Sequence, residues 1–93
     1  MEVYPVSESC KYTNLSASAL IASGKGKLLG IFVASSAAAT VKLWDQTSAA
    51  TPVIVNTFTA VAGTFYPIPA AFDTGLYCTI VGTADMTVFW TRP

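Results

Sequence analysis

The triplet Asp73-Thr74-Gly75 has the residue types of an aspartic-protease active site. In such an enzyme two carboxylates share one proton, and a homodimer of short chains supplies one carboxylate from each subunit. The surrounding residues depart from the retroviral pattern, because Leu76 stands where that family usually has Ala or Ser. In addition, only the residues up to 93 follow Gly75, which is too few for the family's flap and second loop. We therefore expect a tight turn, in which Asp73 bonds the backbone ahead and Gly75 takes a positive φ.

No other grouping of side chains supports catalysis. The chain has no histidine, so it has no Ser-His-Asp or Cys-His arrangement and no histidine metal site. Residues 23–27 (SGKGK) lack the spacing of a phosphate-binding loop, and Cys10 and Cys78 are too far apart for a zinc knuckle. No two acids lie near enough in sequence to suggest a glycosidase pair; the acids are Glu2, Glu8, Asp45, Asp73 and Asp85. We expect no enzymatic activity, no cofactor and no metal.

The charges are few and balanced, which argues against nucleic acid as a partner. Five basic residues match five acidic ones, and only Lys25 and Lys27 lie close together, whereas a phosphate backbone requires clustered positive charge. The N-terminal sequence lacks the basic and apolar regions of a signal peptide. The apolar run 28–34 is shorter than the ~20 residues of a membrane span. We expect synthesis in the cytoplasm, no membrane partner, and reduced thiols at Cys10 and Cys78.

The composition predicts a chain that associates. Of its residues 53% are hydrophobic and only 11% are charged, against about 25% charged in a typical domain. A single domain of 93 residues buries only about 60–65% of its unfolded surface, so its core is thin. Large exposed apolar patches usually mark contact surfaces, and we therefore expect a subunit interface.

Alternation of apolar and polar residues is the dominant pattern and predicts β-strands separated by turns every 8–12 residues or so. The fold class we predict is all-β, an antiparallel β-sandwich (jelly-roll-like) of about seven or eight strands. Pro67 and Pro69 place their strand at a sheet edge or break it, because proline cannot donate a ladder hydrogen bond. The expected strands are 12–16, 29–33, 41–44, 53–59, 65–68, 76–80 and 86–91, with 3–6 as a further candidate, and the expected turns are 23–26, 45–48, 62–64, 73–75 and 82–85. The residues expected to point inward are Leu29, Ile31, Val33, Val41, Leu43, Leu76, Cys78, Ile80, Met86 and Val88.

The aromatic residues allow two interpretations. Trp44 shares a strand face with Lys42 and Thr40 and is expected to look outward. A flat sugar-binding platform is one reading of the aromatic set Trp44, Trp90, Tyr12, Tyr66 and Tyr77. The favoured reading is that both tryptophans fill a core or a subunit seam, because interfaces also select aromatic anchors.

Several segments carry a resemblance that covers about residues 12–90. They are LLGIFVASSAAATVKLWDQTSAA (28–50), VNTFTAVAGTFYPIPAAFDTGLYCTI (55–80) and GTADMTVFW (82–90). Their strand and turn patterns resemble small structural proteins encoded by tailed bacteriophages, cyanobacterial phages included. The resemblance implies a compact β-sandwich in the virion: a capsid decoration (cement) protein or, alternatively, a tail, fibre or baseplate component. A carbohydrate-binding module is a third reading.

On this resemblance, residues 12–93 form a single β-sandwich domain, and residues 1–11, which lie outside it, form an N-terminal arm. The implied partners are the major capsid protein and further copies of the chain, as a homotrimer at three-fold points of the capsid. The implied location is the virion, after synthesis in the host cytoplasm. The residues expected to contact the capsid or another subunit are Val3, Tyr4, Val6, Trp44 and Trp90.

Overall fold

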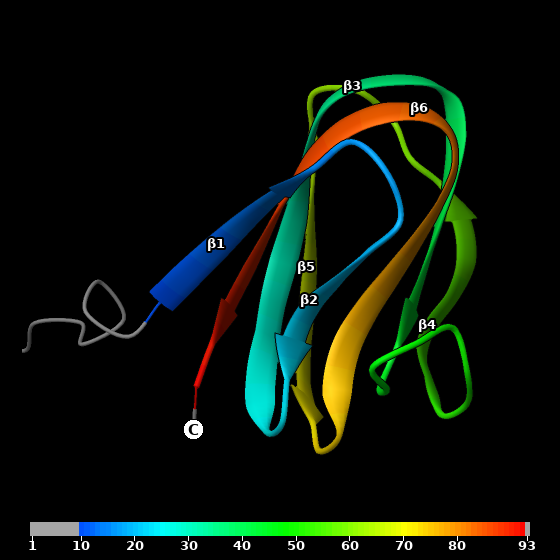
Figure 1. The fold of residues 1–93 in the computed structure, drawn as a ribbon. Coiled ribbons are helices and arrows are strands. Elements are labelled where there is room, and N and C mark those ends of the chain that lie inside the picture. The colour runs from blue at the N-terminus through cyan, green and yellow to red at the C-terminus, as the bar shows by residue number, and fades with distance from the viewer. Residues whose placement is uncertain (1–9, 93) are drawn as a thin grey trace, which may run out of the picture.

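The structure, a computed structural model, describes residues 10–92, and this part of the chain contains strands and turns but no helix. Six strands are present within it (Figure 1). They are β1 (Cys10–Leu15), β2 (Ala19–Ser23), β3 (Gly26–Trp44), β4 (Val53–Thr59), β5 (Thr64–Phe72) and β6 (Gly75–Thr91). All pairings are antiparallel, which confirms the predicted all-β antiparallel class.

The two long strands β3 and β6 pair along their whole length and form the backbone of the sheet. Their register runs from Lys27 opposite Thr91 to Trp44 opposite Tyr77. One half of this pair is flanked by β1 and β5, in the order β1-β6-β3-β5, and we call it the first half. The other half is flanked by β2 and β4, in the order β2-β6-β3-β4, and we call it the second half.

The β3–β6 pair arches over between the two halves (Figure 1). At the arch Ala38 and Gly82 have positive φ values of 56° and 101°, and the register shifts between Ala37 and Thr40. A Cβ on Gly82 would lie 3.1 Å from Cα of Ala39, so both conformation and space favour glycine there. The turn expected at 82–85 is therefore wrong: the strand bends there and continues.

The bend explains the strand count. The expected strands 29–33 and 41–44 are one continuous strand, β3, and 76–80 and 86–91 are likewise one strand, β6. Residues 10–92 thus form six strands in one hydrogen-bonded sheet, rather than seven or eight. The strand β2 was not among those expected. The expected first strand begins two residues early, at Cys10, so that Cys10 and Lys11 belong to the sheet and not to an arm.

Both halves contribute to one hydrophobic core, which lies between them. Nine of the ten residues expected to point inward are buried, as predicted. The exception is Leu29, which is partly exposed while Leu28 is fully buried. The register of β3 shifts between Leu28 and Gly30 against both neighbours, and this bulge changes which residues face inward.

Candidate interaction surfaces

The triplet Asp73-Thr74-Gly75 forms the turn between β5 and β6, as predicted. The carboxylate of Asp45, at the end of β3, accepts hydrogen bonds from all three backbone N–H groups of the triplet. The N–H of Asp73 donates to both oxygens at 3.0 and 3.1 Å, that of Thr74 at 2.9 Å and that of Gly75 at 3.3 Å. A carboxylate that accepts several N–H donors is held strongly, because the bonds are charge-assisted.

Two details of the predicted turn are wrong. The hydrogen-bonding carboxylate belongs to Asp45, whereas Asp73 is exposed and contributes its backbone N–H. The backbone of Gly75 does not have a positive φ; glycine is needed there because a Cβ would lie 2.8 Å from the carbonyl oxygen of Gln46 and 3.0 Å from that of Ala22. The triplet is therefore a tightly packed structural turn.

Burial and hydrogen bonding shift the pKa of Asp45 in opposite directions. Partial burial raises the pKa of the carboxyl, but the hydrogen bonds from Thr74, Asp73 and Gly75 outweigh it and leave the pKa below its ordinary value. The carboxylate therefore stabilises the turn as an anion.

The two thiols differ in environment, and both are free. Burial raises the pKa of Cys78 to about 12, so its thiol remains protonated and packs as an apolar side chain. Within residues 10–92, no three histidine, cysteine or acidic side chains are grouped so as to hold a metal ion.

The outward side of the first half carries a surface that we call the aromatic face: Tyr12, Phe32, Phe65 and Phe89. Register places Tyr12 beside Phe89, and Phe32 beside Phe65, in two neighbouring rows on this side of the sheet. Tyr12 is 75% exposed, Phe65 49% and Phe32 39%. The rings of Phe65 and Phe89 are tilted at 59° with centroids 6.2 Å apart, so the two rows are in contact.

Glycine and uncharged residues complete the aromatic face. Gly30 lies between Phe89 and Pro67 in the sheet, and a Cβ there would meet the Phe65 ring at 2.6 Å. The tip of the Phe65 ring thus occupies the space beside Gly30 on β3 that a side chain would fill. The other members of the two rows, Asn14, Thr87 and Pro67, carry no charge. An outward sheet face of this composition is typical of a contact surface.

The outward side of the second half also has an apolar row, which contains the predicted contact residue Trp44. Register places Leu20, Tyr77, Trp44 and Val53 side by side across four strands. The Lys42 ammonium lies 4.3 Å from the centre of the Trp44 ring, and the indole N–H donates to the Thr79 hydroxyl at 2.9 Å. Trp44 looks outward, as expected, but lysine covers its ring.

The other predicted contact residues differ in position. Trp90 is only 7% exposed; its indole N–H donates to the Thr13 hydroxyl at 3.2 Å, and Arg92 lies over its ring. It fills the core, in line with the favoured reading, and offers little area to a partner. Val3, Tyr4 and Val6 lie outside the described residues. The suggested sugar platform is not assembled, since its aromatic residues are divided between the two outward sides and the core.

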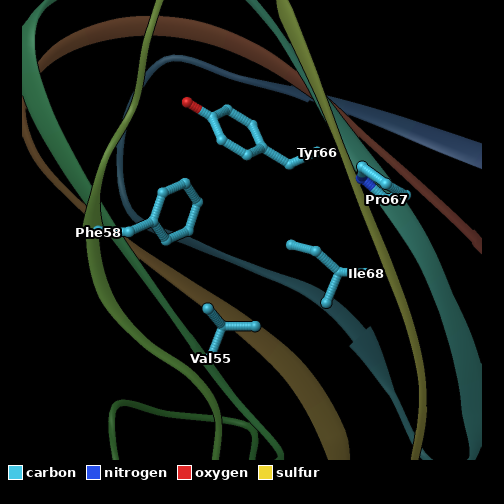
Figure 2. Close-up of a pocket in the computed structure, with 5 residues that line it drawn as sticks. All are labelled: Val55, Phe58, Tyr66, Pro67 and Ile68. Atoms are coloured by element: carbon cyan, nitrogen blue, oxygen red, sulfur yellow. The ribbon is translucent and has the colours of Figure 1, made fainter.

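A hollow separates the edges of β4 and β5 and exposes part of the core (Figure 2). We call it the seam hollow; its volume is about 260 Å³ and it is lined by Val55, Phe58, Tyr66, Pro67 and Ile68. The Phe58 and Tyr66 rings meet across the seam with centroids 5.1 Å apart, and the Tyr66 hydroxyl accepts a hydrogen bond from the N–H of Val61 at 3.1 Å.

Sequence reasoning missed most of the aromatic face. The alternation in 29–33 and 86–91 already turns Phe32 and Phe89 away from the core, and this was a usable signal. Tyr12 and Phe65 lie beside Phe89 and Phe32 only because of the sheet register, which cannot be read from the sequence.

Comparison with known proteins adds no relative: no protein-family model matches the chain, and searches of curated proteins and of solved structures find no match. Among the described residues there is no helix of the length and hydrophobicity needed to cross a membrane.

Proposed function

We propose that the chain is a structural protein of a tailed-phage virion, a decoration (cement) protein that binds the outer face of the head and stabilises it. The observation that carries this proposal is the uncharged aromatic face on the outward side of the first half. The solvent-facing side of an antiparallel sheet normally carries polar residues. Four aromatic side chains on this side therefore favour a surface that a partner covers. The phage setting comes from the resemblance of residues 12–90.

A contact role suits the described chemistry better than catalysis or sugar binding. The motif's own carboxylate, that of Asp73, is exposed, and the carboxylate beside the motif, that of Asp45, is occupied by three backbone N–H groups. Trp44, the outward tryptophan of the second half, is covered by Lys42, so a sugar ring would first have to displace the ammonium. The aromatic face needs no such rearrangement before it meets a protein surface.

The partners we propose are the major capsid protein, through the aromatic face, and further copies of this chain, as a homotrimer at three-fold points of the shell. Exposed aromatic rings are the side chains that most often dominate the energy of such contacts. The second candidate is a tail, fibre or baseplate component. We rank it lower because fibre proteins usually have longer chains with shaft-forming repeats.

Two measurements test the proposal. The copy number of the chain in purified particles separates the alternatives, since hundreds of copies indicate the capsid and tens or fewer the tail. In a capsid-binding assay, Phe65→Ser should weaken attachment at least tenfold. Val53→Ser, a matched exposed residue on the opposite outward side, should leave it unchanged. Equal binding by both variants would contradict a role for the aromatic face.

A further inference from the structure

The seam hollow is an opening in the core that strand pairing leaves uncovered. Within residues 10–92, β4 and β5 each pair with β3, at opposite halves, and not with each other. In Figure 2 the side chains of Val55, Phe58, Tyr66 and Ile68 surround an open centre. No charged residue lines it, so the surface suits an apolar occupant.

Both edges of the hollow are poor templates for an added strand. On β5, Pro67 and Pro69 have no N–H to donate. On β4 the register shifts twice, and the N–H of Thr57 already donates to the side chain of Asn56 at 2.8 Å. An occupant must therefore bind through its side chains. A cavity of about 150 Å³ holds benzene, so 260 Å³ accommodates one aromatic ring together with a smaller apolar side chain.

The chain itself contains a segment with these properties. Val3, Tyr4, Pro5 and Val6 form an apolar stretch in residues 1–9, outside the described part. The residue before a proline favours an extended backbone, and aromatic-lined grooves commonly bind extended proline-containing segments by their side chains.

Position favours a second copy as the source of this segment, and charge favours the contact itself. Residues 1–9 precede β1 in the sequence, whereas β5 is the opposite edge of the first half, about 14 Å from β1 across three strand spacings. Donor and acceptor thus lie on opposite edges, which is the arrangement of a head-to-tail contact, and such a contact forms a ring when its rotation closes. Residues 1–9 hold two acids and no lysine or arginine, while residues 10–92 hold five basic and three acidic residues, so the two parts attract.

We propose that the seam hollow binds Tyr4, with Val3 and Val6, of a second copy of this chain, and that repetition of this contact forms the homo-oligomer. This inference rests on the self-association in the proposed function, but it needs no virion. It can therefore fail in solution while the virion location still holds, and the reverse is also true.

Sedimentation of the full-length chain tests it. The wild type should sediment as a species larger than a monomer. Tyr4→Ser, which removes the donor ring, and Phe58→Ser, which removes a wall of the hollow, should each raise the dissociation constant at least tenfold. In a mixture of the two variants, the Phe58→Ser chain still supplies Tyr4 and the Tyr4→Ser chain still has an intact seam hollow. The mixture should therefore form a one-to-one dimer that grows no further. Phe65→Ser, a matched change on the aromatic face, should associate as the wild type does.

Three results would overturn the proposal: a monomeric wild type, a Tyr4→Ser variant that associates normally, or a mixture of the two variants that stays monomeric. Circular dichroism of each variant controls for folding. If Phe58→Ser loses its strand signal, Val55→Ser replaces it as the acceptor variant, and Tyr4→Ser alone still decides whether the donor ring is required.

Discussion

The turn at Asp73-Thr74-Gly75 and the aromatic face differ in whether the described residues supply contacts for their surface groups. At the turn, three N–H groups converge on the Asp45 carboxylate, so the polar groups have their partners inside the chain. On the aromatic face, Tyr12 is 75% and Phe65 49% exposed, and nothing within residues 10–92 covers them. The turn that looks catalytic thus has its polar groups paired within the chain, while the aromatic face, which has no motif, is the surface for which we propose a partner.

The turn should be the more sensitive of the two regions to mutation, and Gly75→Val should have the largest effect. The added side chain would overlap the carbonyl oxygens of Gln46 and Ala22, which are backbone atoms and cannot move aside cheaply. We expect a loss of about 3 kcal/mol or more in the free energy of unfolding.

The control for this variant is Gly63→Ala. Gly63 has a φ of 75° but no atom within 4 Å of the added Cβ, so its cost should be only about 1 kcal/mol. Urea denaturation compares the two variants. Equal losses would contradict the prediction, because they would show that the close approach of the Gln46 and Ala22 carbonyl oxygens at Gly75 adds no cost.

Asp45→Asn should have the next largest effect. The amide is neutral, so the hydrogen bonds from Asp73, Thr74 and Gly75 lose their charge assistance, and we expect a cost of about 1–3 kcal/mol. Asp73→Asn is the matched control: its carboxylate is exposed, and the change should stay within about 0.5 kcal/mol. The opposite ranking, or peptidase activity that vanishes in Asp73→Asn, would restore the protease interpretation.

The same carboxylate predicts an acid sensitivity. The pKa of Asp45 is lower in the folded chain than its ordinary value of 3.8, so the folded state binds the proton less readily. Its stabilisation is complete above the ordinary pKa and is lost as the pH falls through the lowered folded value. The difference in unfolding free energy between wild type and Asp45→Asn should therefore shrink below about pH 4. A difference that persists at the lowest pH would show that the charge is not the cause.

The sequence predicted the parts of this fold that depend on local alternation. Ile31, Val33 and Val88 were identified as inward residues by period two alone, and they are buried. Leu29 was misplaced because a bulge is a property of two paired strands. The sequence around Gly82 predicts a turn where the strand only bends, because a glycine with positive φ is typical of both.

Contacts between distant residues were beyond the same reasoning. Asp45 reaches a turn that is 28 residues away in the sequence, and nothing in its neighbours indicates this. Tyr12 meets Phe89 only because β1 returns to pair with the end of β6. The hydrogen bonds from the turn to Asp45 and the grouping of the aromatic face both depend on strand register, which is set by the whole fold.

The aromatic face should show the smallest effect on stability. Tyr12 is 75% exposed, so Tyr12→Ser should change the free energy of unfolding by no more than about 0.5 kcal/mol. Tyr66→Ser makes a matched comparison, because the Tyr66 ring packs on Phe58 and its hydroxyl accepts the Val61 N–H; we expect it to cost about 2 kcal/mol. Urea denaturation measures both, and capsid binding by Tyr12→Ser should weaken although its fold is intact. A loss of stability in Tyr12→Ser as large as that in Tyr66→Ser would mean that the aromatic face stabilises the fold itself, and the comparison with the turn would no longer hold.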